Sequence, residues 1–312
     1  MKRALHTILA LVALFVAAEV VAQNTTAEKR VQLADPFILL HEGTYYAYGT
    51  HNPHGIEYYI SNDLKNWHYG GLALHKKDSY GTKWFWAPEV YHLNGKFYMY
   101  YTAENRICAA TSDSPIGPFK QVEQVPMLPN EHAIDNTLFI DDDGTPYLFF
   151  VHIKNGFHIK VAELERDLIT IKTSTIKTCI SPRQKWERME GKVNEGPSII
   201  KHKGAYYMLY SGNGYTSQLY GIGYATATDI RGPWRKSDEN PILQLPGKLV
   251  GSGHGAPFYD KKGHLHYVFH AHNSEEKVHP RCMHISRASF KRAGKNIDDF
   301  VISTRYFTPT KK

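Results

Sequence analysis

The chain has 312 residues, of which 42% are hydrophobic and 13% aromatic, and its formal net charge is +7. This length allows one large domain, and three cysteines permit at most one disulfide, which excludes a disulfide-stabilised scaffold. A basic balance suggests nucleic acid as a partner, but we find no stripe of Lys and Arg and no nucleic-acid motif, so nucleic-acid binding is not expected.

Residues 1–22 have the pattern of a secretory signal peptide. Lys2-Arg3 precedes an apolar run over residues 8–18, and the small residues at 20–22 offer a cleavage site. The run is too short to span a membrane stably, and no later segment replaces it. We therefore expect an exported protein, secreted or periplasmic, whose mature part (23–312) is a single domain without membrane insertion.

A glycine followed by an aromatic strand recurs five times along the rest of the chain. Each glycine lies in a polar turn between two apolar segments, so each repeat contains a β-hairpin. The gaps between successive glycines are 52, 49, 60 and 59 residues, and helical periodicity is nearly absent. The glycines are Gly43, Gly95, Gly144, Gly204 and Gly263.

Five β units of this size, none of which can bury both of its faces alone, predict an all-β fold, a five-bladed β-propeller over residues 23–312. The alternative is a β-sandwich with similar hairpins. Because the elements occur in the same order within each repeat, we favour the propeller.

Acidic residues stand at the heads of the first strands of several repeats. In a propeller these strands surround the axis, so the residues that head them should meet there. They are Asp35, Glu89, Asp135, Glu195 and the turn Gly253–Gly255. Acids gathered on one axis lose hydration and repel one another, which costs stability, so such a cluster indicates chemistry more than folding.

Four short motifs, in this order, resemble the signature of glycoside hydrolase family 43. They are Ala34-Asp35-Pro36, Trp86-Ala87-Pro88-Glu89, Ile134-Asp135 and Asn194-Glu195-Gly196-Pro197. The resemblance covers nearly all of residues 31–290. It implies a five-bladed β-propeller that hydrolyses glycosidic bonds with inversion and mostly releases arabinofuranose or xylose from plant glycans.

The resemblance implies that Asp35 is the general base, Glu195 the general acid and Asp135 a third carboxylate that tunes the pKa of the acid. An inverting hydrolase needs one carboxylate to activate water and one carboxylic acid to protonate the leaving oxygen, about 6.5–9.5 Å apart. Strand heads on different blades can supply that separation. Glu195 must hold a proton near neutral pH, so burial and a nearby carboxylate should raise its pKa above about 4.3.

Four other residues are predicted to contact the substrate, and each has a structural alternative. Trp86 should form a wall of the sugar pocket or else pack between blades. Glu89 should bind substrate hydroxyls or else a backbone amide. Arg281 resembles an arginine that the family places near the catalytic acids, the alternative being a surface position. His254, which resembles a histidine at the channel centre, is otherwise held by hydrogen bonds alone.

Metals and cofactors enter only through the resemblance. It makes His254 a candidate neighbour of a central calcium ion, but calcium prefers oxygen ligands and one histidine does not make a metal site. We therefore assign no metal ligand and expect no required cofactor. We interpret the histidines of a later strand as structural and not as a zinc site; they are His264, His266, His270 and His272.

Together these features predict an exo-acting, inverting glycoside hydrolase that releases a terminal pentose, first α-L-arabinofuranose, from plant oligo- or polysaccharides. β-Xylose and β-galactofuranose are alternatives, because pocket shape decides the sugar. A non-catalytic carbohydrate-binding propeller would lack the base or the acid, and all three carboxylates are present. Further residues are expected at the pocket rim: His51, Asn52, His54, Trp84 and Trp186.

Overall fold

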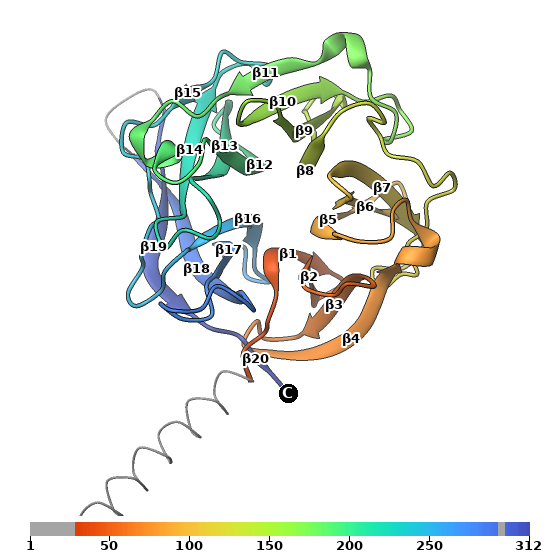
Figure 1. Cartoon of the computed structure of the whole chain (residues 1–312), viewed down its shortest axis with the longest axis horizontal. Coiled ribbons are helices and arrows are strands. Elements are labelled where there is room, and N and C mark those ends of the chain that lie inside the picture. Colours follow the sequence, from red (N-terminus) through yellow and green to blue (C-terminus); the bar gives the residue numbers. More distant parts are fainter. Residues whose placement is uncertain (1–28, 293–296) are drawn as a thin grey trace, which may run out of the picture.

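The computed structural model describes residues 29–292 and 297–312, which form five β-sheets arranged as blades around one axis (Figure 1). The predicted five-bladed β-propeller is thereby confirmed. The predicted signal peptide at residues 1–22 lies outside the described residues. Within the described ranges, no helix has the length and apolar character needed to cross a membrane.

The blades follow one another along the chain, and the consecutive strands of each blade pair antiparallel. Blade 1 contains β1 (Ala34–His41), β2 (Thr44–Thr50), β3 (Gly55–Ser61) and β4 (Asn66–His75), and blade 2 contains β5 (Trp86–Leu93), β6 (Lys96–Ala103) and β7 (Arg106–Ser112). Blade 3 contains β8 (Ala133–Ile140), β9 (Pro146–Ile153), β10 (Phe157–Glu163) and β11 (Lys177–Ile180). Blade 4 contains β12 (Asn194–His202), β13 (Ala205–Gly212), β14 (Gly221–Ala227) and β15 (Arg235–Lys236). Blade 5 contains β16 (Gly253–Tyr259), β17 (Leu265–Ala271), β18 (Cys282–Lys291) and β19 (Asp299–Phe307).

The C-terminal segment joins the first blade. Strand β20 (Thr310–Lys311) pairs in parallel with β4, where Thr310 lies opposite Asn66 (Figure 1). Arg30 also bridges to Thr310, so residues from both ends of the described chain meet at blade 1. Pairing of this kind ties the ends of the ring together and covers the outer edge of β4.

The five repeated glycines occupy the turns between the first and second strands of the blades, as predicted. Their φ angles lie between 74° and 84°, and no atom lies within 4 Å of the position that a Cβ would take. The left-handed backbone, and not crowding, therefore explains the residue type at these turns.

Apolar side chains form five buried clusters, and each cluster lies between two adjacent blades. Between blades 1 and 2, for example, Tyr48 and Ile56 pack in one cluster with Val90 and Met99. Equivalent clusters fill the other four interfaces. The core thus consists of contacts between blades, which is why no blade would be stable alone. The three cysteines are free.

Each first strand begins with a β-bulge, at which one residue has a positive φ angle. The bulge residues occupy equivalent positions in the five blades and have φ angles between 39° and 56°; they are Asp35, Ala87, Asp135, Gly196 and His254. Bulges bend a strand and redirect its side chains. Here they redirect the strand heads at one end of the propeller.

A repeated hydrogen bond holds these bulges across the blade interfaces. In four blades, one residue of the second strand lies opposite the residue that precedes the bulge. Its side chain accepts the backbone N–H of the bulge residue in the next blade, at a distance of 2.8–3.0 Å. The acceptors are Thr50 for Ala87, Thr102 for Asp135, Ser211 for His254 and His270 for Asp35. Blade 3 carries Val151 at this register, which has no polar atom, and the N–H of Gly196 donates to Asp135 Oδ2 at 3.3 Å.

Candidate active site

A cavity of about 890 Å³ opens where the first strands begin. All five blades contribute to its wall, through strand heads and through the connections between second and third strands. The three predicted catalytic carboxylates line it together with three of the four predicted substrate-binding residues; they are Asp35, Asp135, Glu195, Trp86, His254 and Arg281. Residues far apart in the chain thus share one cavity.

Asp35 is buried and lies next to hydrogen-bond donors and the guanidinium of Arg281. Thr50 Oγ1 donates to Oδ2 at 2.6 Å, and Arg281 donates to Oδ1 at 3.0 Å. Burial alone would raise the pKa of Asp35, but Arg281, His254 and His270 outweigh it and hold that pKa well below its usual range. Asp35 is therefore ionised at any physiological pH, as a general base must be.

Glu195 has the opposite character, although it lies in the same cavity. Burial raises its pKa to about 7, and the negative charge of Asp35 adds to the rise. The Tyr220 hydroxyl donates to Oε1 at 2.7 Å, which favours the charged form and lowers the pKa in part. A carboxyl group that titrates near neutrality can donate a proton at the working pH of most enzymes.

Asp135 is the third buried carboxyl group of the cavity. Burial is the largest cause that raises its pKa well above the usual value, followed by the negative charges of Glu195 and Asp35. Its Oδ2 accepts the N–H of Gly196, the residue after Glu195. The charge of Glu195 thus acts on Asp135, and the backbone of Gly196 joins the two residues, whereas the neighbouring charge that raises the pKa of Glu195 is that of Asp35. Burial contributes more to the raised pKa of Glu195 than any neighbouring charge does.

His254 lies at the centre of the carboxylates. Its Nδ1 is 3.4 Å from Asp35 Oδ1 and 3.9 Å from Asp135 Oδ2, while burial lowers its pKa. The ring packs against Gly196, where a Cβ would come within 2.7 Å of it, so any larger residue at that bulge would displace the imidazole. A neutral imidazole here lies next to both carboxyl groups without adding a positive charge to the site.

The surroundings of His254 do not fit a calcium ion. Calcium takes six to eight oxygen ligands, and within residues 29–292 and 297–312 no group of three or more His, Cys, Asp or Glu side chains is placed to hold a metal. The two carboxylates next to His254 already bind Arg281 and Gly196. We therefore derive no step through calcium.

Trp86 and Arg281 both reach the cavity, as predicted for substrate contacts. Trp86 heads blade 2 and lines the wall there. Arg281 is not a surface residue, because its side chain is only 10% exposed. Its guanidinium lies 4.7 Å from the centroid of the Tyr215 ring, which belongs to the connection between β13 and β14. Arg281 thus joins the wall of the cavity to the carboxylate of Asp35.

Glu89 differs from the other predicted residues, because it does not line the cavity. It lies two residues beyond the bulge at Ala87, and its carboxylate accepts the hydroxyl of Tyr91. Burial raises the pKa of Glu89 to about 7. The predicted contact with substrate hydroxyls therefore has no support in the structure, since the side chain lies farther along the strand than the sugar cavity.

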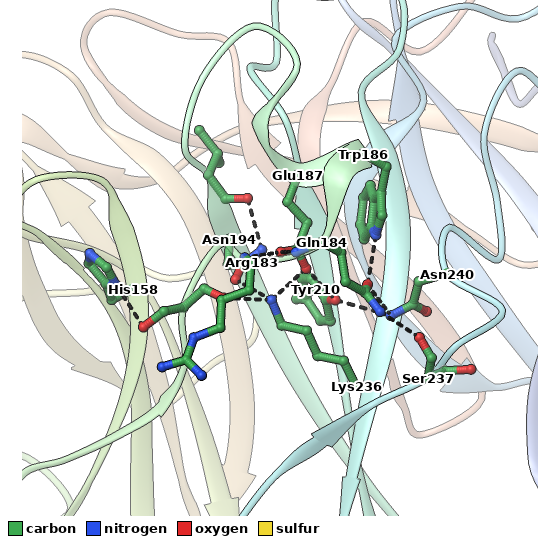
Figure 2. Close-up of polar contacts among 12 residues, drawn as sticks. His158, Arg183, Gln184, Trp186, Glu187, Asn194, Tyr210, Lys236, Ser237 and Asn240 are labelled. Atoms are coloured by element: carbon green, nitrogen blue, oxygen red, sulfur yellow. Dashed lines mark hydrogen bonds and ion pairs between the residues drawn. The ribbon is translucent and has the colours of Figure 1, made fainter.

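A polar network stabilises the segment before Glu195. Lys236 Nζ donates to Glu187 Oε1 at 2.5 Å and to Asn194 Oδ1 at 2.9 Å, while Tyr210 donates to the same Glu187 oxygen at 2.7 Å (Figure 2). Glu187 is completely buried. The network thus connects the outer strand of blade 4 to the residue that immediately precedes Glu195.

The predicted rim is only partly present. His51 lines the cavity, whereas Asn52 and His54 do not. Trp186 was predicted at the rim, but it is buried and donates its indole N–H to Gln184, so that prediction is wrong. Trp84 is outside the cavity lining and stacks on Trp86.

Three supporting residues were missed from the sequence, namely Thr50, Tyr220 and His270. Thr50 and His270 lie at the ends of second strands, at the same register of the repeat. A comparison of polar residues at equivalent strand ends would have found both. Burial lowers the pKa of His270 to about 3, which leaves it neutral. Tyr220 follows an irregular loop, and no pattern pointed to it.

One ionised and one protonable carboxyl group in a single cavity can accept and donate a proton in the same reaction. Comparison with known proteins is consistent with this chemistry. The profile of glycosyl hydrolases family 43 matches residues 29–295. A crystal structure described as an endo-1,4-β-xylanase from Bacteroides thetaiotaomicron is 45% identical, with a TM-score of 0.87, and the match covers 91% of this chain and 98% of that one.

Two characterised relatives match at lower identity. The β-D-galactofuranosidase xynD of Aspergillus niger is 27% identical, over 84% of this chain and 80% of its own length. The extracellular exo-α-(1→5)-L-arabinofuranosidase ArbA of Cellvibrio japonicus is 24% identical, over 80% of this chain and 81% of its own length. The sugars named for these proteins differ, although the matches cover similar shares of this chain.

Proposed function

Because the chain belongs to family 43 of the glycosyl hydrolases, we propose that its cavity hydrolyses glycosidic bonds with inversion at the anomeric carbon. Asp35 is the general base, Glu195 is the general acid and Asp135 modulates the acid. The observation that carries this assignment is the contrast in pKa between two carboxyls of one cavity, lowered at Asp35 and raised to about 7 at Glu195.

In the proposed reaction Asp35 removes a proton from a water molecule as the water oxygen attacks the anomeric carbon. The bond to the leaving oxygen breaks, and Glu195 donates its proton to that oxygen. Asp35 thus ends protonated and Glu195 ionised, and exchange with solvent restores both. Arg281 and Thr50 hold the Asp35 carboxylate in place before the water arrives.

We propose exo action on a terminal pentose, with α-L-arabinofuranose as the first candidate. The support for exo action is that all five blades wall the cavity, which suits a chain end better than the middle of a chain. The name of the Cellvibrio japonicus relative supports arabinofuranose. β-Xylose is the second candidate, since the 45% identical structure is described as a xylanase, and β-galactofuranose follows from the Aspergillus niger relative.

The presence of base, acid and modulator in one cavity favours catalysis over a carbohydrate-binding propeller without activity. We further propose that the protein works after export, on plant-type oligo- or polysaccharides, without a nucleic-acid partner and without a required cofactor. The support for export is the signal-like segment at residues 1–22 together with the extracellular relative.

The test of the proposed function uses Asp35→Asn and Glu195→Gln. Asp35→Asn should lose about 100- to 10,000-fold in kcat on whichever nitrophenyl glycoside the wild type hydrolyses, among arabinofuranoside, xyloside and galactofuranoside. Glu195→Gln should show a loss of that size on a natural glycan of the same sugar and a smaller loss on the nitrophenyl substrate, because nitrophenolate leaves without protonation. Near wild-type turnover of the nitrophenyl glycoside by Asp35→Asn, or of the natural glycan by Glu195→Gln, with circular dichroism unchanged, would overturn the assignment.

A further inference from the structure

An exposed tryptophan lies beside the cavity without lining it. Trp84 is 46% exposed, and its ring stacks on that of Trp86 with a centroid distance of 5.8 Å and an interplanar angle of 18°. Trp86 in turn lines the cavity that holds the three carboxylates. The stack therefore continues the aromatic wall of the cavity out to solvent, where the ammonium of the exposed Lys83 lies 4.4 Å from the centroid of the Trp84 ring.

The backbone at Trp84 has an uncommon conformation. Its φ angle is 60°, in the left-handed region that bulky residues rarely adopt, so this backbone conformation has an energetic cost. Strained residues of this kind cluster at ligand-binding sites, where the surrounding structure enforces them. The next residue, Phe85, is buried in the cluster between blades 1 and 2.

The segment that carries Trp84 is fixed on both sides. Thr82 donates its N–H and its hydroxyl to Glu104 Oε1, at 3.0 and 3.1 Å, and the N–H of Glu104 returns a bond to the Lys83 carbonyl at 3.3 Å. Asn105, the next residue, lines the cavity. The exposed indole is thus rigidly placed next to the cavity before any ligand binds, which reduces the entropy lost on binding.

We propose that Trp84 is a sugar-binding platform for the unit next to the one held in the cavity, in a neutral pentose oligosaccharide. The C–H face of a sugar packs on an indole ring, which offers a large apolar area at little conformational cost. Continuity with Trp86 identifies the occupant as part of the same glycan chain. This inference rests on the proposed function and specifies the substrate as a chain of at least two sugars.

The test compares Trp84→Ala with the wild type on two substrates of the same pentose, a linear trisaccharide and the glycosyl fluoride. The fluoride has no second sugar and reports on the cavity alone. For the trisaccharide we expect a loss of about three- to tenfold in kcat/KM, mainly through KM, and for the fluoride a change below about twofold. Trp84→Phe should retain most of the activity on the trisaccharide.

Tyr69→Ala is the matched control, because Tyr69 is an aromatic residue with 53% exposure that packs edge-on against Tyr59 and does not line the cavity. It should leave both substrates unaffected. If Trp84→Ala leaves KM for the trisaccharide unchanged, or loses kcat/KM equally on both substrates, Trp84 is not a sugar-binding platform. The proposed hydrolysis would be unaffected by that result. If the wild type cleaves neither substrate, the proposed function fails, and calorimetric binding of the trisaccharide to wild type and Trp84→Ala still decides the role of Trp84.

Discussion

The carboxylate of Asp135 accepts the backbone N–H of Gly196, at the one blade interface where the repeated second-strand acceptor is missing. Thr50, Thr102, Ser211 and His270 perform this task at the other four interfaces. Val151 stands at the equivalent register of blade 3 and cannot accept. Asp135 therefore combines this structural bond with a carboxyl group whose own pKa is raised by burial and by the charge of Glu195.

The two roles of Asp135 should separate in variants. Asp135→Ala removes the acceptor and should cost about 1–3 kcal/mol of unfolding free energy, because the buried N–H of Gly196 is left unpaired, and it should also lower kcat. Asp135→Asn keeps an acceptor oxygen and should lose kcat with little loss of stability. Urea unfolding and kcat, measured on the same preparations, check this.

Val151→Thr provides a rescue of the structural role alone. Threonine has nearly the shape of valine and places a hydroxyl at the register that Thr50 and Thr102 occupy in their blades. In the Asp135→Ala background it should restore most of the lost unfolding free energy and leave kcat low. Recovery of kcat together with stability would show that Asp135 acts only through the backbone of Gly196.

Tyr220→Phe should move the alkaline limb of the pH–activity profile to higher pH. The hydroxyl of Tyr220 favours the ionised form of Glu195 and so lowers its pKa, and its removal raises that pKa. Because the acid must be protonated, activity then persists to higher pH. The ring stack on His270, with a centroid distance of 5.8 Å, remains in the variant. An alkaline limb that stays in place or moves to lower pH would contradict the predicted effect of Tyr220 on the pKa of Glu195.

Arg281→Met should shift the acidic limb of the pH–activity profile. Arg281 is the strongest of the neighbours that lower the pKa of Asp35, so its loss raises that pKa. The base must be ionised, and the acidic limb of kcat/KM therefore moves to higher pH. Arg281→Lys, which keeps the charge, should restore the position of the limb in large part. An acidic limb that does not respond would argue that Asp35 is not the group that titrates there.

Lys236→Met should be strongly destabilising. It leaves the carboxylate of Glu187 buried without its cation, a change that costs about 3–5 kcal/mol for buried pairs. The neighbouring pair of Arg235 and Asp238 is a matched control, since both side chains are 83% exposed, and Arg235→Ala should change stability by less than about 1 kcal/mol. Denaturant midpoints measure both variants. Equal effects would mean that the network of Figure 2 contributes no more than a surface ion pair.

The fold could be predicted from the repeated glycines, because each lies at a hairpin turn whose backbone favours glycine. The strand heads Asp35 and Glu195 could be predicted because residues at the head of a first strand must face the axis. The direction in which each of these side chains points could not be predicted. The bulges shift the register, so that Glu195 precedes its bulge residue, Asp35 is the bulge residue itself and Glu89 lies two positions beyond its own.

That shift explains why Glu89, which the sequence grouped with the other acids, does not line the cavity with them. Side chains alternate along a strand, and a difference of one or two positions around a bulge changes which part of the axis they reach. The partners of the proposed catalytic carboxylates were harder to predict. Tyr220 meets Glu195 from an irregular loop within blade 4, and His270 of blade 5 meets Asp35 of blade 1 only in the closed ring.

The stereochemistry of the first product tests the central claim most directly. An ionised Asp35 that activates water, opposite a protonated Glu195, requires inversion at the anomeric carbon. Proton NMR during the first minutes of hydrolysis, before mutarotation, should show the anomer opposite to that of the glycoside, so that an α-L-arabinofuranoside gives β-L-arabinofuranose. Release of the α-anomer first would mean that a carboxylate attacks the sugar itself, and it would contradict the roles assigned to Asp35 and Glu195.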